Sequence, residues 1–338
     1  MVQTISISSQ TTTMKNTFSL LTITILLSMP FLFIKSTTIN NDNRETFSSY
    51  KEPEREAYDA LTFVSAANAF PNSDIPSDGY AKAWVKHRQI LAAAKPAGTR
   101  SGWETIGPNN IGGRTVSIAI DPVDTGIIWL GSASGGLWKS TKGGNGINAW
   151  TYISTGYPVL GVGAVSINPT NHDEMFIGTG ETYSYGTSTS GLIDRTQRGS
   201  FGIGILKSTD GGSSWSMSLD WTYQQNRGVW DVLYNPLNTS ILYAATTEGV
   251  YKSSDGGSTW INVLDKKMVM DLEIDHVDTN IIYAGVGNED SADKGIYKTT
   301  NGGATWTLLT GNGLPAAYTN DGRITISTYD GDNHTVMA

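Results

Sequence analysis

The fold of this chain is decided by the nine-residue stretch Lys252-Ser253-Ser254-Asp255-Gly256-Gly257-Ser258-Thr259-Trp260, which occurs four times with small changes. Close copies occupy residues 207–215 and 298–306. A looser copy begins at Lys139 and has three extra residues before its tryptophan, Trp150. The tryptophans of the three close copies recur every 45 or 46 residues, so the chain is built from units of about that length.

A second shared pattern lies upstream of each copy. It consists of an apolar run, Asp or Asn, usually Pro, a polar turn and another apolar run, as in Ile118–Pro122 followed by Ile127–Gly131. Each unit therefore contains four β-like runs, which in the first unit are Arg114–Ile120, Ile127–Ser132, Leu137–Thr141 and Trp150–Ser154. Short, evenly spaced strands with a glycine and aromatic signature in every unit are typical of an all-β fold, the β-propeller, in which each unit is a four-stranded blade.

This repeat predicts the domain organisation. The full blades are expected at about 103–154, 155–219, 226–264 and 268–310, and a partial fifth blade at 323–338. A polar and helical leader is expected over 39–102, with helices over 54–69 and 80–94. Because blades must stack on neighbours, we expect a longer form of the protein with more blades.

Composition excludes several functions. The 38 Gly and 10 Trp with only 16% charged residues suit a turn-rich, aromatic-packed domain. A net charge of -8 disfavours nucleic-acid binding, which normally needs a basic surface. Because cysteine is absent, disulfides, thiolate metal sites and a cysteine nucleophile are excluded. No motif indicates a cofactor or a metal site, and we expect a monomer.

The start of the chain predicts export. Met14-Lys15-Asn16 precedes an uncharged run, Thr17 to Ile34, that is rich in Leu, Ile and Phe, which is the layout of a signal peptide over about 1–38. Met14 is then a candidate initiator. The alternative is an uncleaved membrane anchor, since the run is close to the ~18 residues that span a bilayer. Pro30 and the polar tract that follows favour cleavage, so we expect a secreted or outer-surface protein with no remaining membrane span.

The repeated stretch matches the pattern Ser/Thr-x-Asp-x-Gly-x-x-Trp, known as the Asp-box or BNR repeat. Its carboxylate is expected to accept backbone hydrogen bonds, its glycines to allow positive φ and its tryptophan to hold the hairpin shut. Equivalent copies in separate blades are dispersed, so a structural role is predicted instead of paired catalytic acids. The residues in this role are Asp210, Trp215, Asp255, Trp260, Asn301 and Trp306.

From Trp103 onward the chain resembles exported bacterial propellers grouped with the sortilin N-terminal domain and with BNR-repeat glycosyl hydrolases. Besides the Asp-boxes, the segments Gly107–Arg114 and Gly131–Ser140 carry this resemblance. Proteins of this kind are typical of Bacteroidetes-like bacteria. The resemblance implies the fold more strongly than the chemistry, because such folds host several functions.

Two groups of enzymes within the resemblance need particular catalytic residues, which can be sought at the matching positions of this chain. The two-propeller xyloglucan hydrolases place a catalytic Asp where this chain has Ala133, and a methyl group cannot act as a base. Sialidases require three arginines around a carboxylate. Arg114 and Arg323 begin equivalent innermost strands, but Arg227 is offset by one residue from that position.

The loops after each second strand and between blades share one face of a propeller, and ligands are expected there. Predicted ligand-binding residues are Arg114, Glu181, Tyr183, Tyr185, Arg195 and Arg323, several of them in a long insertion over 182–200. Weak catalytic candidates are Glu181, Asp194, Glu289 and Asp290. The preferred function is binding of an extracellular glycan, protein or peptide. The alternatives are a xyloglucanase-like or sialidase-like glycoside hydrolase, and an assembly factor like the related propeller of photosystem biogenesis.

Overall fold

The structure is a computed structural model. It describes residues 63, 66–67, 70–71, 79–93, 113–146, 148–159, 161–182, 202–222, 227–287, 293–311, 313–315, 318, 323–328 and 336–338. The helix expected over 80–94 is present as α2 (Gly79–Ala93). Most of the helix expected over 54–69, and all of the predicted signal region, lie outside the described residues. Within the described part of the chain, no helix has the length and apolar character needed to cross a membrane.

Four antiparallel four-stranded sheets follow one another along the chain. The first blade contains β1 (Thr115–Ile120), β2 (Ile128–Ser132), β3 (Leu137–Ser140) and β4 (Trp150–Ile153). The second contains β5 (Val162–Ile167), β6 (Met175–Thr179), β7 (Gly204–Ser208) and β8 (Ser216–Asp220). The third contains β9 (Val229–Tyr234), β10 (Leu242–Thr246), β11 (Gly249–Ser253) and β12 (Ile261–Leu264). The fourth contains β13 (Val269–Ile274), β14 (Ile282–Val286), β15 (Gly295–Thr299) and β16 (Thr307–Leu308).

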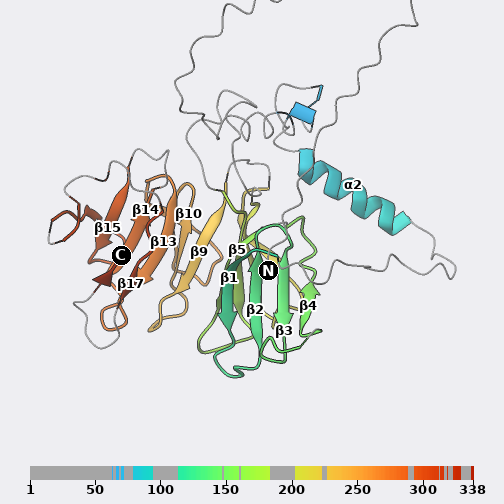
Figure 1. The fold of residues 1–338 in the computed structure, drawn as a ribbon, viewed down its shortest axis with the longest axis horizontal. Helices are drawn as coiled ribbons and strands as arrows, with labels where there is room; N and C mark the ends of the chain where they lie inside the picture. The colour runs from blue at the N-terminus through green and yellow to red at the C-terminus, as the bar shows by residue number, and fades with distance from the viewer. Residues whose placement is uncertain are drawn as a thin grey trace, which may run out of the picture. The chain divides into compact units, whose positions relative to one another are not determined.

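The first strands of successive sheets lie side by side, with β1 against β5, β5 against β9 and β9 against β13 (Figure 1). A short strand β17 (Ser327–Thr328), paired with β18 (Val336–Met337), follows β13 in the same series. The predicted fold class is therefore confirmed: the chain is a β-propeller with four full blades and the start of a fifth. In the first blade, the strand limits differ from the predicted ones by no more than one residue.

Close backbone approach between blades explains several glycines. A Cβ atom at Gly131 of β2 would lie 2.3 Å from the carbonyl oxygen of Val162, on the first strand of the next blade. A Cβ at Gly178 of β6 would lie 2.6 Å from a methyl carbon of Val229. Since real Cβ atoms do not tolerate such distances, a side chain at either position would push neighbouring sheets apart.

The Asp or Asn after each first strand closes the following turn. The Oδ1 atom of Asp121 accepts hydrogen bonds from the backbone N–H groups of Val123 and Asp124, at 2.8 and 3.0 Å. The same pair of contacts, two and three residues downstream, is made by Asn168, Asn235 and Asp275. This side-chain-to-backbone bonding is the physical reason for Asp or Asn at that position of the repeat.

The nine-residue motif forms the turn between the third and fourth strands. Asp255 accepts hydrogen bonds from Thr259 N at 2.8 Å, from Thr259 Oγ1 at 2.6 Å and from Ser253 Oγ at 2.8 Å. These donors, led by the Thr259 hydroxyl, lower the pKa of Asp255 to about 2. Gly256 and Gly257 have φ of 66° and 80°, a conformation that favours glycine. Asp210 makes equivalent contacts, so the predicted local role of these carboxylates is seen in the geometry.

The two divergent copies keep part of this network. Asn301 still accepts from Thr305 N at 2.9 Å, but its Nδ2 now donates to Thr305 Oγ1 at 2.8 Å. In the loosest copy, Ser140 Oγ still accepts from Gly144 N at 3.0 Å. Position 142 is a lysine, so this turn lacks the side-chain acceptor that Asp or Asn supplies in the other copies and depends on the hydrogen bond of Ser140.

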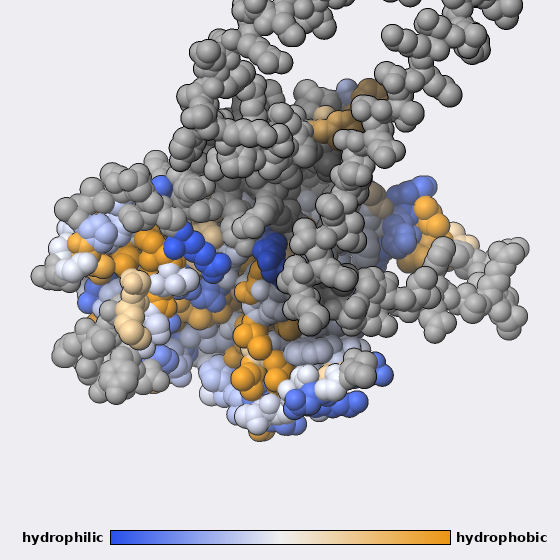
Figure 2. All heavy atoms as spheres, in the orientation of Figure 1, coloured by the Kyte–Doolittle hydropathy of each residue, from blue (hydrophilic) through white to orange (hydrophobic). Residues whose placement is uncertain are grey.

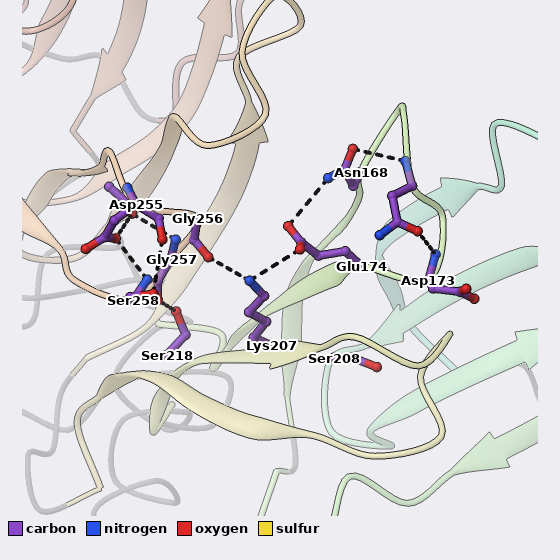
Figure 3. Close-up of polar contacts among 12 residues, drawn as sticks. Asn168, Asp173, Glu174, Lys207, Ser208, Ser218, Asp255, Gly256, Gly257 and Ser258 are labelled. Atoms are coloured by element: carbon purple, nitrogen blue, oxygen red, sulfur yellow. Dashed lines mark hydrogen bonds and ion pairs between the residues drawn. The ribbon is translucent and has the colours of Figure 1, made fainter.

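The motif also joins neighbouring blades, a contact that was not predicted from its sequence pattern. Lys207 of the second blade donates to the carbonyl of Gly256 in the third at 2.8 Å and lies 3.4 Å from Glu174 (Figure 3). A Cβ at Gly257 would lie 2.5 Å from the ring of Phe176. The glycine turn of one blade therefore rests on an aromatic ring and a lysine of the blade before it.

The first strand of the first blade is exposed on a face that a preceding blade covers in the later blades. Ile118 and Ile120 of β1 are 63% and 57% exposed, and Figure 2 shows apolar surface over this strand. Val232 and Tyr234, at the same positions of β9, are 2% and 8% exposed because the second blade packs over them. Burial of the first strand is thus a property of the contact between blades.

Candidate functional site

One end of the sheets carries the loops in which a ligand was predicted. At the other end, the motif turns hydrogen-bond to the turns between first and second strands, as Gly256 N does to Ser240 O at 2.9 Å. At the end where a ligand was predicted, the residue after each second strand donates its N–H to the carbonyl of the residue immediately before the first strand. These pairs are Ala133 with Arg114, Gly180 with Gly161, Thr247 with Gly228, and Gly287 with Met268. The predicted repeat alignment at this end is therefore correct.

Arg114 and Glu181, both predicted ligand residues, are joined directly. Arg114 Nη2 lies 2.6 Å from Glu181 Oε2, and Arg114 Nη1 contacts Glu181 Oε1. The Glu181 side chain is fully buried, whereas that of Arg114 is 47% exposed. This bidentate ion pair links the first blade to the second, and about half of the Arg114 side chain remains exposed.

Arg323, the third described ligand candidate, reaches the same region through Trp230. The indole Nε1 of Trp230 donates to the carbonyl of Thr182, the residue after Glu181, at 3.1 Å. The guanidinium carbon of Arg323 lies 5.1 Å from the centre of the Trp230 ring. Thr182 Oγ1 is buried and has no hydrogen-bond partner within the described ranges of the chain. Residues of the first, second, third and fifth blades are thus connected in one cluster, which we call the mouth cluster: Arg114, Glu181, Thr182, Trp230 and Arg323.

A second charged cluster surrounds Glu248, a residue that was not predicted as part of a site. Its side chain is 8% exposed and lies 2.8 Å from Lys267 Nζ and 3.3 Å from Arg227 Nε. Arg227 also stacks over Trp221, with 5.1 Å between guanidinium carbon and ring centre. Glu248 follows β10 at the place where Glu181 follows β6. The shared spacing Thr-x-Glu, at Thr179–Glu181 and Thr246–Glu248, could have revealed it.

Carboxyl groups on the innermost strands form a further feature absent from the prediction. Asp271 accepts from Ile326 N at 2.5 Å, and Glu273 accepts from Thr328 N at 3.2 Å. Burial raises the pKa of Asp271. Burial, together with the charge of Asp271, raises the pKa of Asp231 to about 7. Innermost strands are sheet edges with unpaired N–H groups, so these acids act as acceptors that bridge consecutive blades.

The remaining predicted residues stand as follows. Ala133, at the place where the xyloglucan hydrolases carry an Asp, is buried, and its N–H bonds to Arg114. Arg114 and Arg227 are each paired with a buried glutamate, so they do not form a trio around a common acceptor. The other candidates lie outside the described residues: Tyr183, Tyr185, Asp194, Arg195, Glu289 and Asp290. Among the described residues, no three His, Asp or Glu side chains are grouped to hold a metal ion.

Comparison with solved structures gives matches of the same general fold. An ancestral GH74 enzyme is 23% identical, with a TM-score of 0.47, over 63% of this chain and 26% of its own. The GH74 enzyme of Niastella koreensis is 20% identical, with a TM-score of 0.49, over 66% of this chain and 33% of its own. YCF48 from Cyanidioschyzon merolae is 16% identical, with a TM-score of 0.40, over 66% and 62%.

The four consecutive four-stranded sheets define the class of protein. The chain is a β-propeller, and it spans about a quarter of the first GH74 enzyme and a third of the second. No protein-family model and no curated protein sequence matches it. At these identities the likeness concerns the fold alone, so function has to be argued from the side chains.

Proposed function

We propose that this protein is an exported or cell-surface propeller that binds a glycan, protein or peptide at the mouth cluster. The observation that carries the proposal is the convergence of Arg114, Glu181 and Arg323, from three different blades, at the end of the sheets opposite the motif turns. The Arg323 side chain is exposed, and its guanidinium group offers charge-assisted hydrogen-bond donors to a ligand. Arg114 is held by Glu181 and Arg323 rests on Trp230, which reduces the side-chain entropy lost on binding.

The long insertion predicted over 182–200 continues from this cluster in sequence. Its Tyr183, Tyr185 and Arg195 remain predicted ligand residues, since stacking on sugar or side-chain faces suits tyrosine. Alanine at position 133 supports binding without hydrolysis by the xyloglucanase route, because that position holds no carboxylate.

A glycoside hydrolase is the second candidate, favoured by one observation. Asp231, whose pKa is raised to about 7, lies near Asp271, so one carboxyl group can be protonated at neutral pH beside another acid. Glycosidases use a carboxyl pair of this kind as acid and base or nucleophile. The hydrogen bond that Asp271 accepts from Ile326 N favours a structural role for these carboxyl groups, as links between blades.

A glycan and peptide array, combined with a reducing-sugar release screen, tests the proposal. We expect binding without sugar release, and a loss of about tenfold or more in affinity for Arg323→Ala, which removes one charge-assisted contact. Lys142→Ala is the matched control, because this exposed cation lies in a motif turn at the opposite end. Equal binding by both variants would place the ligand elsewhere. Sugar release abolished by Asp231→Asn would favour the enzyme instead.

A further inference from the structure

The charged cluster around Glu248, which the proposed function leaves unused, is continuous with the mouth cluster. Thr182 of the mouth cluster lies against Gly228, because a Cβ atom at Gly228 would be 3.0 Å from Thr182 Oγ1. Arg227 directly precedes Gly228 and lies 3.3 Å from Glu248. The two clusters therefore belong to one surface at the end of the sheets where a ligand was predicted.

The cations of this surface share a position in the repeat, just before the innermost strand of a blade. Arg114 lies one residue before β1, and Arg227 and Lys267 lie two residues before β9 and β13. Arg323 is the counterpart of Arg114 in the fifth blade. Because the first strands of successive blades lie side by side, these cations follow one another around the inner edge of the propeller. We call them the cationic rim: Arg114, Arg227, Lys267 and Arg323.

The glutamates that pair with the rim are more deeply buried than its cations. The side chains of Glu181 and Glu248 are 0% and 8% exposed, whereas those of Arg114 and Lys267 are 47% and 38% exposed. Asp265, which lies 3.6 Å from Lys267 Nζ, is an exposed acid beside the rim. A ligand that approaches the inner edge therefore meets the cations before it meets the glutamates.

Two arginines of the rim also rest on indole rings. Arg227 lies over Trp221 and Arg323 over Trp230, each with 5.1 Å between the guanidinium carbon and the ring centre. An arginine supported in this way presents a planar set of N–H donors that matches the oxygens of a carboxylate or sulfate group. Little side-chain entropy is then lost when such a group binds.

A ligand of this rim needs several negative charges, because exposed ion pairs are individually weak and are screened by salt. The net charge of -8 is spread over the whole chain, and salt screens charges more than about 8–10 Å away, so the local cations decide the contact. A polysaccharide with acidic groups on successive sugars supplies repeated charges on a stiff backbone. It therefore loses less conformational entropy on binding than a flexible acidic peptide.

We propose that the cationic rim binds an acidic polysaccharide, whose carboxylate or sulfate groups contact the exposed sides of its arginines and lysine. The inference rests on the proposed function, which places a ligand at the mouth cluster. It adds the class of glycan and a second subsite, formed by Arg227 and Lys267.

Titration calorimetry of the full chain with four polymers tests the class of ligand. Polygalacturonate is the carboxylate probe, and its methyl ester is the matched neutral polymer on the same backbone. Dextran sulfate is the sulfate probe, and poly-glutamate is a flexible peptide with repeated charge. We expect one or both acidic polysaccharides to bind, with an affinity that falls as the salt concentration rises, and the methyl ester not to bind.

Lys267→Gln and Arg323→Gln test the two clusters separately. Each removes one charge and keeps a hydrogen-bond donor, and each should weaken binding of the acidic polysaccharide about three- to tenfold. Lys142→Gln is the matched control, because it removes an exposed charge from a motif turn at the opposite end and should leave the affinity unchanged. Lys267→Arg should retain binding, and thermal melting checks that all variants are folded.

Several results would overturn the inference. Failure of both acidic polysaccharides to bind, equal binding of the methyl ester, or tighter binding of poly-glutamate would each exclude this class of ligand, while the mouth cluster could still bind another. A loss of affinity for Arg323→Gln without one for Lys267→Gln would confine the ligand to the mouth cluster. Unchanged affinity for both variants would contradict the proposed function as well.

Discussion

Trp260 Nε1 donates a 2.9 Å hydrogen bond to Ser218 Oγ, which belongs to the neighbouring second blade. Ser218 Oγ in turn donates to the carbonyl of Gly257 at 2.5 Å. One hydroxyl group therefore satisfies both an indole N–H and a turn carbonyl across the joint. At the next joint, Val263 stands at the position of Ser218, and the buried Nε1 of Trp306 has no hydrogen-bond partner among the residues that the structure describes. The repeat thus contains one complete and one incomplete version of the same contact.

Val263→Ser should supply the missing acceptor for Trp306. Because the substitution also removes two methyl groups, the matched reference is Val263→Ala, which removes them without adding a hydroxyl. We expect the serine variant to be more stable than the alanine variant by about 0.5–1.5 kcal/mol, the net worth of a buried hydrogen bond. Urea unfolding followed by tryptophan fluorescence measures the difference.

The reverse substitution checks the same contact. Ser218→Ala should lower the free energy of unfolding by about 1–2 kcal/mol, because it leaves Trp260 Nε1 without an acceptor. Equal stabilities for the serine and alanine variants at position 263 would mean that Trp306 finds its acceptor elsewhere.

Removal of Arg114 alone should lower the free energy of unfolding more than removal of both members of its ion pair with Glu181. Arg114→Met removes the guanidinium group that pairs with the buried carboxylate of Glu181, with an expected loss of about 1–3 kcal/mol in the free energy of unfolding. The double variant with Glu181→Gln should recover part of this loss, since a neutral amide is cheaper to bury. Chemical denaturation of the four proteins of this cycle gives the coupling energy. A double variant as unstable as the sum of the single ones would contradict the pairing.

The Asp255 carboxylate in its motif turn predicts how the stability of the protein depends on pH. The folded pKa of Asp255 is about 2, below the ordinary value of 3.8, so its contribution is present above 3.8 and is lost as the pH falls through 2. Asn301→Asp should introduce the same behaviour in the fourth blade. The melting temperature of this variant, relative to the parent, should rise between pH 2 and 4 and then level off. Asn145→Asp, in an exposed turn, is the control and should show a flat difference.

The raised pKa of Asp231 predicts the opposite dependence of stability on pH. Its pKa is raised to about 7 mainly by burial, so between 3.8 and 7 the unfolded chain ionises while the folded one stays protonated. Folding is therefore progressively disfavoured as the pH rises through this window, and the penalty is complete above 7. Asp231→Asn should raise the melting temperature at pH 8 by about 2–6 °C, with little effect at pH 4. Asp265→Asn, at an exposed position, should show no such trend.

Much of the fold could be predicted because the information is local. Asp255, Gly256 and Gly257 lie within three residues of one another, and their turn depends on contacts with Ser253 and Thr259 in the same motif. Repetition of that motif then placed the strands to within about one residue in the first blade. The site was only partly predictable. Arg114, Glu181 and Arg323 were assigned to one face, but the partners Trp230 and Glu248 were not recognised.

The sequence alone determined the repeat, the number of described blades and the turn chemistry, because each depends on residues a few positions apart. Only the tertiary structure decided that Arg114 pairs with Glu181, 67 positions away, and that Asp271 bonds to Ile326. Such contacts depend on the distance and rotation between stacked sheets, which glycines such as Gly131 and Gly178 set through close backbone approach. A repeat pattern specifies each blade, whereas the meeting of side chains from different blades is a consequence of how the blades pack.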